Sequence, residues 1–150
     1  MTSPALVLDA AALSELATSR DSELSPLLYG LLEAAWERRR DVLVPALVCA
    51  EVCRGRARTA QVEALLARHR PGERQSSPIL VVDTNFSVAR LVGSVLNASK
   101  AGSEDIVDAH LVALCIDRGG GLIVTSDPED LRRLSVPFIG TRIVVRSLNL

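Results

Sequence analysis

Short apolar runs alternate with longer amphipathic segments along the whole chain. Five of these runs have the length and flanking turn signals of buried strands. The expected strands are residues 4–8, 42–44, 79–82, 122–124 and 142–145. Buried strands that are separated by helices indicate βα units. We therefore predict an α/β fold with three layers, α/β/α, a central and mainly parallel five-stranded sheet, and a single domain over residues 1–150.

The segments between the expected strands have helical spacing and recognisable starts. Ser25 followed by Pro26 is a typical helix start, Thr59 is expected to cap another helix, and either Asp83 or Thr84 is expected to cap a third. Residues 71–78 are rich in Pro, Ser and Gly and are expected to form a loop. The expected helices are residues 10–18, 25–40, 45 to beyond 51, 59–69, 84–99, 103–116 and a short one from 127.

Composition excludes several classes of protein. Apolar residues make up 48% and charged residues 23% of the 150 residues, as in folded globular proteins. The longest apolar runs, such as residues 43–50, are shorter than the roughly 20 residues of a membrane-spanning helix. The first residues have no basic stretch of the kind that begins a secretory signal, so we expect a cytoplasmic protein without a membrane partner.

The basic residues are almost all arginine, which favours bidentate contacts with phosphate and carboxylate groups. Lys100 is the single lysine among 17 basic residues. Arg54, Arg56 and Arg58 begin an arginine-rich stretch between residues 54 and 74. This stretch is typical of a solvated helix face, and it also fits a surface that contacts RNA. The charge run alone leaves both interpretations open.

Four acidic residues occupy positions where the predicted fold brings chemistry together. Asp9 ends the first strand and Asp127 follows the fourth, so both belong to the edge where ligands bind in open parallel sheets. Glu51 and Asp108 interrupt apolar helical sequence. Clustered carboxylates repel one another, and shared protons, an arginine or a hard divalent cation relieve that repulsion. The spacing alone also allows four separate acids that face solvent.

The segments that contain these acids resemble the PIN-domain ribonucleases, and most of all the VapC-type toxins of bacterial toxin–antitoxin pairs. The resemblance covers nearly the whole chain and keeps the order of the motifs. Each motif alone is weak, but the four together in a hydrophobic frame are specific. The matching segments are residues 6–9, 44–52, 105–114 and 122–131.

The resemblance implies a metal-dependent endoribonuclease that cuts transfer RNA or ribosomal RNA. Asp9, Glu51, Asp108 and Asp127 match the family's four acidic positions, which bind Mg²⁺ or Mn²⁺ and carry catalysis. It also implies a homodimer and a cognate antitoxin as partner, with RNA or the antitoxin contacting Arg54, Arg56 and Arg58. Three further residues match auxiliary positions: Thr125, Asp130 and Asp105.

One departure from the family pattern keeps alternatives open. Many PIN domains have a Thr or a polar pair after the first acid, whereas this chain has Ala10 and Ala11. A PIN-fold binding module with impaired catalysis is therefore one alternative, unless Ser14 or water replaces the missing group. A receiver-like signalling domain phosphorylated on Asp83 is another, because Asp83 ends the third expected strand.

Overall fold

The structure is a computed structural model and describes residues 4–19, 25–69 and 78–148. In this part of the chain, five strands form one sheet in the order β3-β2-β1-β4-β5. All neighbouring strands are parallel. The prediction of a mainly parallel five-stranded sheet is therefore confirmed. The strands are β1 (Ala5–Leu8), β2 (Val42–Pro45), β3 (Ile79–Val82), β4 (Gly121–Thr125) and β5 (Ile143–Ser147).

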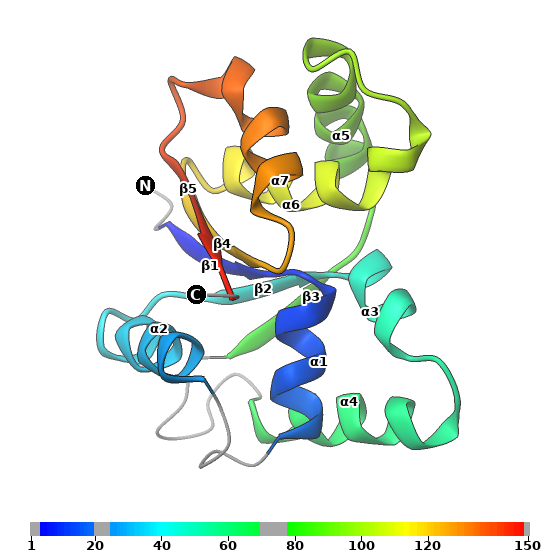
Figure 1. Ribbon diagram of the computed structural model, residues 1–150, viewed down its shortest axis with the longest axis vertical. Helices are drawn as coiled ribbons and strands as arrows, with labels where there is room; N and C mark the ends of the chain where they lie inside the picture. The colour runs from blue at the N-terminus through cyan, green and yellow to red at the C-terminus, as the bar shows by residue number, and fades with distance from the viewer. Residues whose placement is uncertain (1–3, 20–24, 70–77, 149–150) are drawn as a thin grey trace.

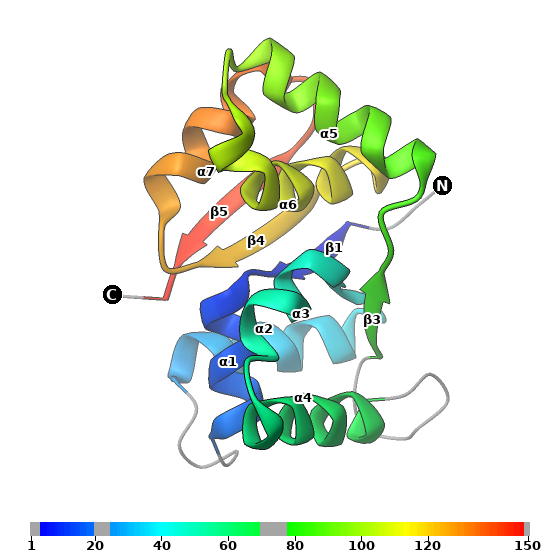
Figure 2. The same ribbon diagram turned by 90° about the vertical axis from the view of Figure 1, so that its right-hand side faces the viewer.

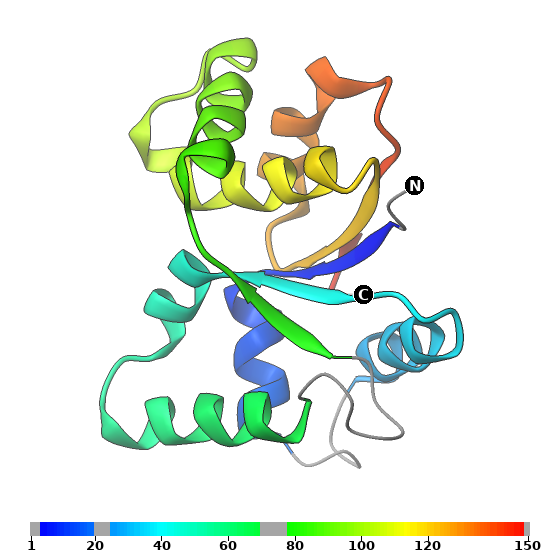
Figure 3. The same cartoon turned by 180° about the vertical axis from the view of Figure 1, so that it is seen from behind.

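Helices cover both faces of the sheet, as Figures 1 and 2 show. The view from behind shows α5 and α6 side by side above the sheet (Figure 3). Two short 3₁₀ turns, Ser103–Asp105 and Val136–Phe138, complete the described elements. One face carries α5 (Phe86–Ala98), α6 (Ile106–Asp117) and α7 (Pro128–Ser135). The other carries α1 (Ala10–Thr18), α2 (Pro26–Glu37), α3 (Ala46–Val52) and α4 (Arg56–Arg68).

The apolar runs form strands because both faces of the sheet are covered. All residues of β1 and β2 are buried, as expected for central parallel strands between two helical layers. The turn from α6 into β4 uses glycines at positive φ, 72° at Gly119 and 141° at Gly120. A side chain at Gly121 would come within 2.8 Å of the Cys115 sulfur, so this turn packs closely on α6.

Several predicted boundaries are wrong in detail. Thr59 does not cap α4, which begins at Arg56 after Gly55 at φ 92°. Asp83 and Thr84 do not cap α5; Asn85 does, and its side chain accepts a hydrogen bond from the Val88 amide. The 3₁₀ turn at residues 103–105 precedes α6, which begins at Ile106. Residues 71–77 of the predicted loop lie outside the described residues.

The strand order places a switch point at the carboxyl ends of β1 and β4. The chain runs outward from β1 to β2 and β3, then returns and runs from β4 to β5 on the other side. Open α/β sheets bind ligands at such a reversal. Asp9 follows β1 and Asp127 follows β4, so both lie at this point. None of the helices in the described ranges has the length and apolar character to cross a membrane.

Candidate metal centre

Asp9 is a buried carboxylate held by backbone donors from two segments. It is the N-cap of α1, and its Oδ1 accepts a hydrogen bond of 2.9 Å from the Ala12 amide. Its Oδ2 accepts a second bond of 2.9 Å from the Ser126 amide, directly after β4. The side chain is 8% exposed. A carboxylate has about four lone-pair sites, so these two bonds fix its orientation and leave sites for a cation.

Thr125 shapes the turn that carries Asp127. The Thr125 side chain is buried at the end of β4, and its hydroxyl accepts a hydrogen bond of 2.9 Å from the Asp127 amide. Asp127 itself is exposed before the first turn of α7. A side-chain hydrogen bond with Asp130 raises the pKa of the Asp127 carboxyl. The predicted hydroxyl residue thus acts on the backbone of the turn.

The charges of four other acidic residues act on the Asp108 carboxyl. It lies in the first turn of α6 and is half-buried. Burial raises the pKa of Asp108 to about 6, and the charges of Asp130, Asp127, Asp9 and Asp105 raise it in the same direction. These five acids therefore interact electrostatically at one end of the sheet. A cation placed among them would relieve their repulsion.

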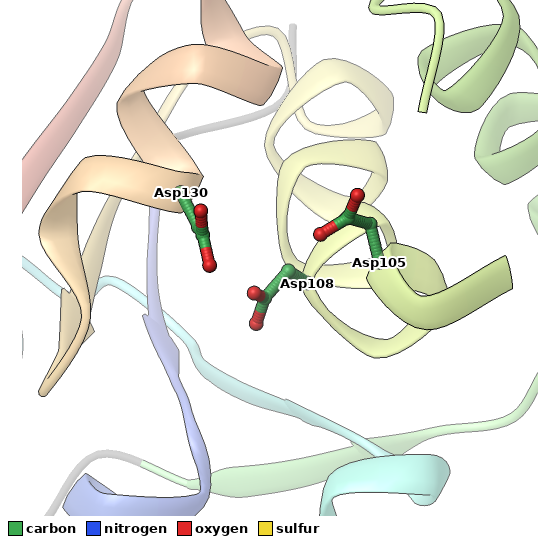
Figure 4. A group of neighbouring side chains, drawn as sticks. All are labelled: Asp105, Asp108 and Asp130. Atoms are coloured by element: carbon green, nitrogen blue, oxygen red, sulfur yellow. The ribbon is translucent and has the colours of Figure 1, made fainter. Parts of the chain in front are cut away.

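Three of the carboxylates gather closely between α6 and α7. One oxygen each from Asp105, Asp108 and Asp130 lies within 4.8 Å of the others. Figure 4 shows Asp130 reaching from α7 toward Asp105 and Asp108 on the opposite segment. Asp105 and Asp130 are thus next to Asp108, although the family resemblance assigned them only auxiliary roles.

Arginine contacts accompany this cluster. The Arg133 guanidinium lies 3.2 Å from Asp105 and 3.5 Å from Asp130. Asp130 and Arg133 are three residues apart on one helix, so the sequence spacing could have indicated this contact, but the sequence analysis did not predict it. The contact with Asp105 joins residues 28 apart in the chain, so it depends on how α7 packs against α6.

Glu51 takes no part in the interactions described above for this cluster. It lies near the end of α3, and its side chain is exposed. Among the described residues, it is neither in the group of three carboxylates nor among the charges that act on Asp108. The helix that carries it does pack against α1, the helix that Asp9 caps.

The three predicted arginines have different environments. Arg58 is half-buried and donates a hydrogen bond of 2.6 Å to the Ser14 hydroxyl, which ties α4 to α1. Arg54 and Arg56 are exposed at the junction of α3 and α4. Ser14, the expected substitute for a missing polar group, is thus engaged with Arg58. Arg54 and Arg56, in contrast to Arg58, have exposed side chains that do not tie α4 to α1 in this way.

His110 is a buried residue with hydrogen bonds to both ring nitrogens. The side chain is 2% exposed. Nδ1 lies 2.7 Å from the Ile106 carbonyl and donates to it, since a carbonyl only accepts. Nε2 of the neutral ring then accepts from the Thr84 hydroxyl at 2.9 Å. The ring joins the segment before α5 to the first turn of α6, a link that no sequence pattern indicated.

Comparisons with known proteins identify the family of this chain. The family model of the PIN domain matches residues 6–137, so the chain belongs to the PIN-domain family. The receiver-like alternative is overturned, because Asp83 follows β3, an edge strand of this sheet. A search of curated proteins finds no match.

Two solved structures are similar to this fold. One is VapBC2 from Rickettsia felis bound to a DNA fragment from their promoter, with 12% identity, a TM-score of 0.61, and coverage of 96% of this chain and 98% of that chain. The other is FitAcB from Neisseria gonorrhoeae, with 15% identity, a TM-score of 0.48, and coverage of 93% and 96%. At 12% identity, the likeness to VapBC2 concerns the fold alone.

Proposed function

We propose that this chain is a divalent-metal-dependent endoribonuclease and the toxin of a toxin–antitoxin pair. PIN domains are generally nucleases, and this chain has the family's fold over most of its length. The observation that supports the proposal most is the position of Asp9 between β1 and β4, together with the charges of Asp9 and Asp127 that act on Asp108 in the first turn of α6. Phosphodiester hydrolysis places negative charge on oxygen atoms, and a metal held by carboxylates stabilises that charge.

The donor set fits a hard divalent cation. Every candidate ligand is a carboxylate oxygen, which Mg²⁺ and Mn²⁺ prefer over nitrogen or sulfur. Asp9 is already oriented by two backbone amides, so its position needs no rearrangement on binding. Asp108 is half-buried among like charges, a situation that a cation improves. These features favour Mg²⁺ or Mn²⁺ as the cofactor.

In the proposed mechanism, Asp9 and Asp108 would hold the principal ion and Asp127 would complete the centre. Glu51, which the family resemblance also assigns to this ion, would reach it from α3, the helix that packs against α1. When bound, the ion polarises the phosphodiester and lowers the pKa of water. Asp9 supplies a fixed anchor between β1 and β4. Asp108 would act as a ligand in its ionised form, and Thr125 keeps the Asp127 turn in place through its hydrogen bond with the Asp127 amide.

The proposed substrate is transfer RNA or ribosomal RNA, and the proposed protein partner is an antitoxin. The antitoxin proposal rests on the resemblance of the sequence to VapC-type toxins, and VapBC2 has a similar fold. On α2, Tyr29 is 53% and Trp36 44% exposed, and large apolar side chains of this kind often mark protein contacts. Arg54 and Arg56 are exposed and available to RNA or to the antitoxin. We also propose a cytoplasmic homodimer.

The first experiment measures RNA cleavage by the purified chain with Mn²⁺ or Mg²⁺. We expect Asp9→Asn and Asp108→Asn each to lower the cleavage rate by more than about 100-fold, because loss of a mere supporting residue already costs 10–100-fold in metal sites. Asp117→Asn is the matched control, since Asp117 is exposed at the other end of α6. Full cleavage by both site variants would contradict the proposal.

A second experiment identifies the substrate and the partner. The chain is expressed with and without the protein encoded by the neighbouring gene, and newly formed RNA ends are sequenced. We expect cleavage at defined sites in transfer or ribosomal RNA, and we expect co-expression to suppress it. Cleavage that the neighbour does not change would contradict the antitoxin proposal and leave the nuclease proposal standing.

The second candidate function is a PIN-fold binding module without catalysis, which Ala10 and Ala11 after the first acid favour. Ala12 also follows, so the first turn of α1 offers no side-chain hydroxyl or amide beside Asp9. Calorimetry with Mn²⁺ separates the two functions. We expect an active centre to bind Mn²⁺ and to cleave RNA, whereas a module that only binds protein or RNA need not bind the ion and does not cleave RNA.

A further inference from the structure

Arg133 is a cation that already lies on part of the acidic cluster. Its guanidinium contacts Asp105 on the α6 side and Asp130 on its own helix, at 3.2 and 3.5 Å. Both carboxylates belong to the group whose oxygens lie within 4.8 Å of one another, and the third member is Asp108. Two of these three carboxylates therefore share one arginine.

The five acidic residues of the cluster form two sets, according to whether they pair with Arg133 or not. In the described part of the chain, both ion pairs to the cluster come from Arg133, and both go to Asp105 and Asp130. Asp9 accepts hydrogen bonds from the Ala12 and Ser126 amides, and Asp127 follows β4, where its own amide donates to the Thr125 hydroxyl. Asp108 lies between the sets, because charges from both act on it. Neither ion pair of Arg133 goes to the other set, Asp9, Asp108 and Asp127, so no charge of that set is offset by this arginine.

The other set has the donor geometry for a second ion. Three carboxylate oxygens within 4.8 Å of one another can converge on one divalent cation. A second ion at that place would have to displace the guanidinium from both carboxylates, and it would repel both the first ion and Arg133. The side chain of Asp105 is 13% exposed, whereas that of Arg133 is 47% exposed, so water screens this ion pair in part.

We propose that Arg133 is a positioning residue that takes the place of a second cation, so that the centre binds one divalent ion tightly. This inference rests on the proposed metal-dependent function. It goes further because it proposes that Arg133 sets the number of divalent ions that the centre binds. Asp105 and Asp130 then act by holding Arg133, while Asp108 remains available to the single ion.

The test is the number of Mn²⁺ ions bound at saturation, measured by calorimetry and by electron paramagnetic resonance of free Mn²⁺. We expect one ion for the wild-type chain and two for Arg133→Gln. Arg132→Gln is the matched control, because Arg132 is the neighbouring arginine on α7 and donates to the Val145 carbonyl instead. This control should bind one ion. Arg133→Lys should also bind one, since the positive charge remains.

A double variant shows where the second ion binds. Arg133→Gln combined with Asp105→Asn removes both the arginine and one donor of the vacated group, and we expect one ion again. Arg133 is about half exposed, so its replacement should leave the fold intact, and a thermal melt confirms this. One ion in both wild type and Arg133→Gln, or two in wild type, overturns the inference alone. No ion in the wild type overturns the proposed metal-dependent function as well.

Discussion

Two helices of equal length behave in opposite ways in this fold. α2 and α6 each have 12 residues, and both are rich in apolar side chains. Seven residues of α6 are buried, whereas in α2 only Leu28 and Ala35 are. α6 lies between α5 and α7 over the central strands, while α2 lies at the margin of the opposite layer (Figure 1).

The difference separates the part of the molecule that holds the site from the part that remains uncovered. The first turn of α6 carries Asp108, and tight packing along the rest of the helix limits how far that carboxylate can move. α2 instead presents Tyr29 and Trp36 to solvent. A rigid helix suits a metal centre, and an uncovered apolar helix suits a protein partner. We therefore place the proposed chemistry on the α6 side and the proposed antitoxin contact on the α2 side.

We expect the largest loss of unfolding free energy when a buried side chain of α6 is truncated. Leu111 is fully buried, so Leu111→Ala should lower the free energy of unfolding by about 2–5 kcal/mol. Leu31 is half-buried on α2, and Leu31→Ala should lower it by about 1 kcal/mol. Urea denaturation of the two variants measures both values. Equal losses would contradict the contrast between the helices.

The burial contrast also shows how far the sequence predicts the fold. Apolar runs of three to five residues predicted all five strands, because local composition decides whether a short segment is buried on both faces. Pattern alone did not distinguish α2 from α6, since both are apolar along most of their length. Their burial depends on which helices pack beside them, and that is a property of the whole topology.

The candidate site was predicted in part for the same reason. Asp9 and Asp127 follow strands, so parallel topology alone predicts that they lie at one edge. The ion pair of Arg133 with Asp105 links residues far apart in the chain, and its existence depends on the packing of α7 on α6. Glu51 remains a prediction from family resemblance, because its exposed side chain is not in the described cluster.

We expect a smaller loss of unfolding free energy when the hydrogen bond between Thr84 and His110 of α6 is removed. Thr84→Val removes the hydroxyl that donates to His110 and leaves a buried ring nitrogen without its partner. Such a loss costs about 1–3 kcal/mol of unfolding free energy. Thr59→Val is the matched control, because the Thr59 hydroxyl bonds to the Gly55 carbonyl at an exposed position on α4. This control should change the value by less than about 0.5 kcal/mol. A similar loss in both variants would show that the His110 link adds nothing specific to α6.

The smallest effect concerns pH and the first turn of α6 in the metal-free protein. The pKa of Asp108 is about 6 in the folded chain against an ordinary value of 3.8, chiefly because of burial. The folded state therefore favours the protonated carboxyl, and the stability it contributes is full below about pH 4 and is lost as pH rises through 6. Asp108 is half-exposed, so water screens the charges, and we expect a loss below about 1 kcal/mol.

The difference in melting temperature between wild type and Asp108→Asn, measured in EDTA from pH 4 to 8, reports this loss. We expect wild type to fall relative to the variant between pH 4 and 6 and then to run parallel to it, because Asn does not titrate. Saturating Mn²⁺ should reverse the trend, since the ion binds only the ionised carboxylate and its binding stabilises the folded state. A difference that stays constant across pH 4–6 would mean that neither burial nor the neighbouring charges raise the pKa of Asp108, and the case for a cation at this turn would lose its electrostatic basis.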